Sequence, residues 1–134
     1  MPSNLKYAAL LKNAKLDAIT SHLGSSAIIR IYSGTQPTNP DTALSGNTVL
    51  AELACSATLA AGASAGVLTL SAITADSSAD NTGTAAWGSI LTSGGTRKID
   101  FTVGTSGSDL NLNTTSIVSG AQVSISAFTL TSGN

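Results

Sequence analysis

The sequence predicts a mainly β protein, an antiparallel, jelly-roll-like β-sandwich with one N-terminal α-helix. Ser, Thr and Ala make up 58 of the 134 residues, and such small residues suit thin sheets better than a helical bundle. Short apolar segments and turn signals alternate at intervals of about 8–12 residues. No helical pattern separates the later segments, which disfavours a parallel α/β sheet. We expect one domain over residues 1–134, with a helix at 3–23 and the sandwich at 27–130.

The helix is predicted from its two ends and from the spacing between them. Ser3 is a suitable N-cap residue, and Gly24 is well placed to end the helix. Leu16, Ile19 and Leu23 recur at helical spacing. The helix also has more leucine than one narrow face requires.

Three of the six basic residues, Lys6, Lys12 and Lys15, lie in this helix. One interpretation is a solvated helix edge. The other is a basic arm that contacts a more acidic neighbouring subunit. These three lysines are therefore the candidate partner-contact residues.

The first half of the sandwich is predicted from apolar segments that turn formers interrupt. Residues 33–41 form a loop with two prolines, and residues 60–66 are small and flexible. The expected strands are 27–32, 49–55 and 67–73.

A β-hairpin is predicted around the pair Gly94 and Gly95, because glycine supplies the positive φ angles of tight turns. The return strand, residues 97–103, alternates with a period of two. The predicted buried face holds Ile99, Phe101 and Val103, and the predicted wet face holds Lys98, Asp100 and Thr102.

Two further strands close the chain. Residues 109–113 alternate leucine with polar residues, which is typical of a short edge strand with little protecting charge. The last strand begins at Gly120 and changes its alternation before Phe128, which predicts a bulge or bend near Ala127. The exposed edge and the leucine-rich helix predict a homodimer or homotrimer.

Charge and composition argue against several classes of partner. The net charge is −1 and charged residues are 10% of the chain, so nucleic acid and anionic membranes are not expected partners. The few aromatic residues are expected to anchor the core. No segment has the pattern of a signal peptide or a membrane span, which predicts assembly in a cytoplasm.

An enzyme is not predicted, because the sequence has no nucleophile–base pair to assemble. His22 is the only histidine and lies where it favours the end of the helix. Cys55 is the only cysteine and is expected in the core. The seven carboxylates show no motif spacing. We therefore expect no catalytic residue and no cofactor.

The best candidate for a metal site is the loop 76–83, which contains Asp76, Asp80 and Asn81. Oxygen ligands of this kind suit Ca²⁺, but the spacing lacks the alternation and the distal glutamate of an EF-hand. An Asx-rich surface turn is the expected structure, and no metal is assigned.

Three segments resemble a known family. They are IRIYSGTQP (29–37) with PDTA (40–43), AEL (51–53) with AITAD (72–76), and VGTSGSDLNLNTTSIVSG (103–120). Together they resemble small structural proteins encoded by tailed bacteriophages and prophages.

The resemblance implies a phage virion structural protein and carries no catalytic residue. The expected role is a capsid decoration, or cement, protein on the exterior of the virion, with the major capsid protein as its partner. A tail, baseplate or virion-surface adhesion component is the alternative, and the resemblance does not separate head from tail.

Overall fold

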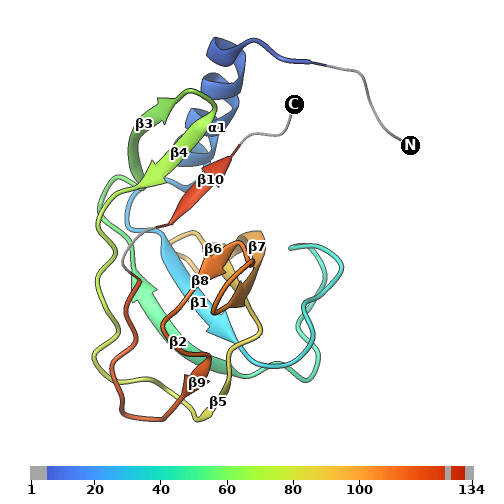
Figure 1. Cartoon of the computed structure of the whole chain (residues 1–134), viewed down its shortest axis with the longest axis vertical. Coiled ribbons are helices and arrows are strands. Elements are labelled where there is room, and N and C mark those ends of the chain that lie inside the picture. Colours follow the sequence, from blue (N-terminus) through green and yellow to red (C-terminus); the bar gives the residue numbers. More distant parts are fainter. Residues whose placement is uncertain (1–5, 126–127, 132–134) are drawn as a thin grey trace.

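The structure, a computed structural model, describes residues 6–125 and 128–131 and is mainly β with one helix (Figure 1). The elements are α1 (Ala9–Leu23), β1 (Ile28–Tyr32), β2 (Val49–Ala54), β3 (Ala60–Ser64), β4 (Val67–Leu70), β5 (Gly83–Thr84), β6 (Trp87–Leu91), β7 (Arg97–Gly104), β8 (Leu110–Asn111), β9 (Ser116–Ile117) and β10 (Thr129–Thr131).

The largest sheet has five strands in the order β2-β1-β6-β7-β8 and curls on itself (Figure 1). Its pairings are antiparallel except for β7 with β8, which is parallel. Strand β6 lies at the centre, and all five of its residues are buried. Even Ser89 on β6 has no exposed surface, so this strand is covered on both faces.

A second layer consists of the three-stranded sheet β10-β4-β3 with α1 against it, at one end of the molecule (Figure 1). Leu16 of α1 packs with Ala60 of β3 and Leu68 of β4. Ile19 and Leu130 also contact the main core, which continues into the five-stranded sheet. Strands β5 and β9 form a small separate pair.

The structure confirms the early strands and the hairpin. The predicted strands at 27–32, 49–55 and 67–73 correspond to β1, β2 and β4. In the turn between β6 and β7, Gly95 has a φ of 91°, and its N–H donates to the Thr92 carbonyl at 2.9 Å.

The alternation of β7 is confirmed except at Asp100 and at Ile99, which was expected to be buried and is half-buried. Phe101 and Val103 are buried, and Lys98 and Thr102 are exposed. The side chain of Asp100 was expected on the wet face, but it is only 3% exposed. The reason is a tertiary partner, because Arg97 forms an ion pair with it at 2.8 Å.

The helix is shorter than predicted. It begins at Ala9, whereas the predicted cap Ser3 lies outside the described residues. Its first turn closes through the Lys12 N–H and the Ala8 carbonyl, without a side-chain cap. The predicted end is confirmed, because Gly24 has a φ of 71° and donates its N–H to the Thr20 carbonyl.

Several strand predictions were wrong. Residues 60–64, expected to be flexible, form β3, because β4 supplies a ladder partner that the small residues alone do not indicate. The expected edge strand is reduced to β8 and runs parallel to β7. Around Gly120 the chain turns, and the last strand is β10.

The predicted bulge at Ala127 lies outside the described residues. Because the strands form three sheets and one pairing is parallel, the jelly-roll-like sandwich stays a prediction.

Candidate interaction surface

Most of the carboxylates are used to fix the fold. Asp17 accepts the N–H of Ala63 at 2.8 Å, and Asp109 accepts both the N–H and the hydroxyl of Thr102. Within residues 6–125 and 128–131, no three His, Cys, Asp or Glu side chains group together as metal ligands.

The loop 76–83 is an Asx turn that covers the outer edge of β2. One carboxylate oxygen of Asp76 accepts the N–H of Ser78 at 3.0 Å, and the other accepts the N–H of Glu52 at 2.9 Å. The Asn81 amide donates to the Val49 carbonyl at 2.7 Å. These bonds use polar groups of the loop to satisfy the outer edge of β2.

Cys55 and His22, the single cysteine and the single histidine, do not belong to a cluster of potential metal ligands among the described residues. Cys55 is buried, and desolvation raises the pKa of its thiol to about 11, which keeps the thiol protonated and inert at neutral pH. His22 is exposed in the last turn of α1.

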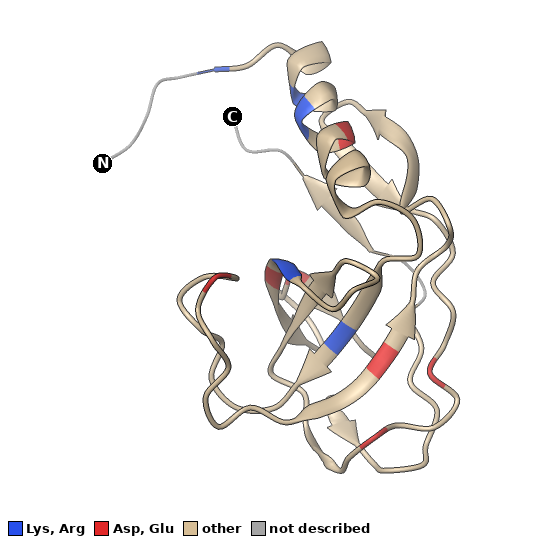
Figure 2. Ribbon diagram, turned by 180° about the vertical axis from the view of Figure 1, so that it is seen from behind, with Lys and Arg blue, Asp and Glu red and all other residues tan. Residues whose placement is uncertain are grey.

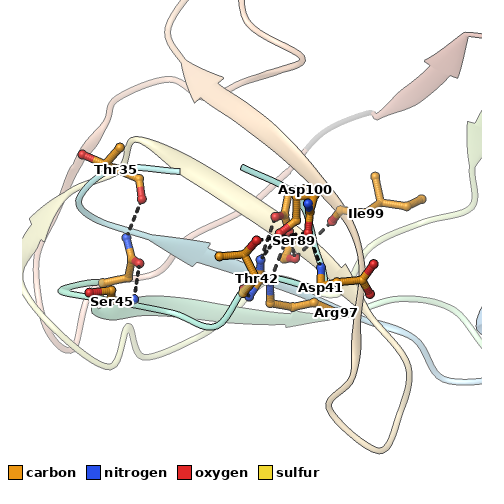
Figure 3. Close-up of polar contacts among 10 residues, drawn as sticks. Thr35, Asp41, Thr42, Ser45, Ser89, Arg97, Ile99 and Asp100 are labelled. Carbon is orange, nitrogen blue, oxygen red and sulfur yellow. Dashed lines mark hydrogen bonds and ion pairs between the residues drawn. The ribbon is translucent and has the colours of Figure 1, made fainter. Parts of the chain in front are cut away.

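A buried ion pair anchors the long loop between β1 and β2 (Figure 3). Arg97 contacts Asp100 through Nη2 and Oδ2 at 2.8 Å, and it also donates to the carbonyls of Thr42 at 2.6 Å and Asn39 at 3.1 Å. Ser89 donates to Asp100 at 2.5 Å. The hydrogen bond to Asp100 raises the pKa of Arg97, which therefore stays charged.

Beneath this loop the rings of Tyr32 and Trp87 stack, with centroids 4.3 Å apart. Arg97 lies over the Trp87 ring at 5.5 Å. The Tyr32 hydroxyl and the Trp87 Nε1 are buried without a hydrogen-bond partner in the described part of the chain. Burial raises the pKa of Tyr32. Both rings have no exposed surface, so they are core anchors, as the sequence predicts.

The three candidate lysines have different surroundings. Lys6 precedes α1 and is exposed. Lys12 is half-buried, and its side chain lies 3.3 Å from the position that a Cβ on Gly66 would occupy. Lys15 lies over the Tyr7 ring at 4.0 Å and lines a groove together with Lys98. The sequence missed Lys98 as a contact candidate, because alternation places it outward without showing that it faces α1.

Helix α1 also presents apolar surface to solvent. Leu10 is 82% exposed and Leu11 is 49% exposed. Apolar residues are distributed around the helix and not along one stripe. These exposed leucines make α1 a candidate surface for binding another protein.

Comparison of the chain with protein-family models, curated proteins and solved structures gives no match. Among the described residues, no helix has the length and apolarity that crossing a membrane requires.

Proposed function

We propose that this chain is a phage virion structural protein, a capsid decoration protein that binds the major-capsid lattice from outside. The observation that carries the proposal is the surface of α1, where Leu10 and Leu11 are exposed on the same helix as the exposed Lys15. Within the described residues, no lysine forms an ion pair. The sequence resemblance indicates the class of partner, the major capsid protein. We expect carboxylates of that protein to contact the lysines.

Decoration stabilises a shell by mass action. A protein that binds the assembled lattice and not free subunits lowers the free energy of the lattice alone. This role requires a rigid scaffold and no chemistry, which agrees with carboxylates engaged in backbone hydrogen bonds.

A homo-oligomer is part of the proposal, and β10 is the edge that suits it. Leu70 donates its N–H to the Phe128 carbonyl at 3.0 Å, so by antiparallel alternation Leu130 bonds next to β4. The N–H and C=O groups of Thr129 and Thr131 then point away from β4. A second copy related by a twofold axis at Leu130 would place each Thr129 opposite the partner's Thr131. The β10-β4-β3 sheets of the two copies would then form one continuous sheet. The β-sandwich predicted from the sequence remains part of this proposal.

The test is co-sedimentation of the purified protein with undecorated shells of the phage that encodes it, after light scattering has given its oligomeric state. We expect a dimer or trimer, saturable binding, and weaker binding as salt rises, because exposed charge contacts are screened. The double variant Lys6→Gln/Lys15→Gln should bind less at low salt. A strictly monomeric protein that never co-sediments would contradict the decoration role.

A tail, baseplate or adhesion component is the second candidate. The long loop between β1 and β2 extends from the end of the sheet (Figure 1), and Arg97 holds the middle of the loop at the carbonyls of Asn39 and Thr42. Loops fixed on a rigid scaffold commonly carry recognition. Cryo-microscopy of the virion separates the two roles, since a head protein decorates the whole shell and a tail protein is confined to the tail.

A further inference from the structure

A groove between α1 and β7 combines an apolar floor with basic side chains. Lys15, Ala18 and His22 line it from α1, and Lys98 lines it from β7. Its volume is about 300 Å³. In Figure 2 basic residues lie on α1, in the upper part of the molecule, and at the start of β7, at the top of the part below it. The floor consists of Ile19, Leu23 and Ile99.

The groove continues toward β10. A second hollow of about 520 Å³ shares Ile19 and Ile99 with it and extends to Phe101 and Phe128. In this second part the Asp100 carboxylate forms an ion pair with Arg97, and the exposed Asp109 carboxylate accepts two hydrogen bonds from the neutral Thr102. The two hollows therefore meet at Ile19 and Ile99, and the lysines line only the first of them.

No carboxylate lines the basic end of the groove. Asp17, the acidic residue of α1, instead accepts the N–H of Ala63 in β3. Among the described residues, Lys15 and Lys98 form no ion pair, and both are exposed. An occupant with negative charge would find complementary cations there and an apolar surface below them.

We infer that this groove binds an extended acidic segment of a partner protein, in which an apolar side chain lies beside carboxylates. The apolar side chain occupies the floor at Ile19 and Ile99, and the carboxylates contact Lys15 and Lys98. The inference rests on the proposed function, under which the segment belongs to the major capsid protein. Under this inference the expected contact residues are Lys15 and Lys98 of the groove, in place of Lys6, Lys12 and Lys15.

Two substitutions test the groove with little change to the fold. Ala18→Glu adds a carboxylate inside the groove at an exposed helix position, and Lys98→Glu reverses a charge on the opposite wall. Ala14→Glu is the matched control, because Ala14 is also exposed on α1 and lies outside the groove lining. Circular dichroism and amide NMR spectra identify any variant that fails to fold.

Binding to undecorated shells is the first measurement. We expect Ala18→Glu and Lys98→Glu each to weaken co-sedimentation by about tenfold, as reversal of a close charge contact does. Ala14→Glu should bind like the unchanged protein. If the unchanged protein decorates shells and both groove variants bind equally well, the groove inference is wrong and the proposed function stands.

Amide NMR titration is the second measurement and requires no shell. The probe is a synthetic peptide that alternates Glu and Leu, and its counterpart has Gln in place of Glu. We expect shifts at Ala18, Lys98 and Ile99 with the acidic peptide only. If the protein never binds shells but these shifts occur, the proposed function fails and the groove is retained. Shifts that are absent, or equal with both peptides, would refute the groove.

Discussion

The ring of Phe101 on β7 lies directly over Gly88 of β6, its partner across the strand ladder. A Cβ at Gly88 would lie 2.6 Å from a carbon of that ring and 3.0 Å from the Arg30 carbonyl. Residue 88 must therefore be glycine for the two strands and the ring to pack as they do.

Gly88→Ala should destabilise the protein by about 1–3 kcal/mol, because the added methyl forces the ring or the backbone to move. Urea unfolding measures the change. Gly94→Ala is the control, since a Cβ there meets only the Thr92 hydroxyl at 3.8 Å. Equal losses in the two variants would show that the contact with Phe101 is not the cause.

Phe101→Ala should lower the free energy of unfolding by about 3–5 kcal/mol, because it leaves a cavity in the core. Phe101 is 3% exposed, and its ring packs edge-on against the Phe128 ring, with the two centroids 4.8 Å apart. A loss below about 1 kcal/mol in denaturant unfolding would place Phe101 in solvent. In the Phe101→Ala background, Gly88→Ala should cost less, which a double-mutant cycle detects.

Arg97→Ala should cost about 3–5 kcal/mol, because it leaves the buried Asp100 carboxylate without its partner. It should also release the loop 33–48, which limited proteolysis detects. The control is Arg30→Ala, whose pair with Glu52 is 30% and 44% exposed and should contribute less than about 1 kcal/mol. Similar losses for both arginines would contradict the assignment of Arg97 as the anchor.

Cys55 should make stability fall as pH rises above about 9. Its thiol pKa is raised by burial from 9.0 to about 11, so between these values the unfolded chain loses a proton that the folded chain keeps. The stability is full below the unfolded value, the loss approaches about 1.4 kcal/mol for each pH unit between the two values, and it stops growing above about pH 11. Cys55→Ala should lack this pH-dependent loss. The free energy of unfolding of both proteins is measured between about pH 7 and 10.5, and the difference between them cancels the effect of Tyr32, which both contain. Identical pH profiles would disprove it.

Chelation should not change the melting temperature. The Asp76 carboxylate accepts the N–H groups of Glu52 and Ser78 and is an internal hydrogen-bond acceptor. Thermal unfolding with EDTA and with added Ca²⁺ measures the effect. Asp76→Ala should lower stability by about 1–3 kcal/mol, because two backbone donors lose their acceptor. A fall with EDTA that Ca²⁺ restores would instead assign the loop as a cation site.

The sequence alone determined the features that depend on local chemistry. The glycine at position 24 ended α1, the pair Gly94 and Gly95 marked the hairpin, and period-two alternation separated Phe101 from Lys98. The high proportion of Ser, Thr and Ala, with short apolar segments between turn signals, predicted a mainly β protein. Each of these signals arises from backbone conformation or from side-chain alternation within a few residues, so no distant partner is needed to recognise it.

Only the tertiary structure decided which distant segments meet. It buried Asp100, because Arg97 and the loop residues Asn39 and Thr42 converge on the same place. It made a strand of residues 60–64 by pairing them with β4, and it paired β8 parallel to β7. It also brought Lys98 opposite α1 and so formed the groove. These outcomes depend on hydrogen-bond and charge partners far away in the chain, and no local pattern encodes a partner's identity.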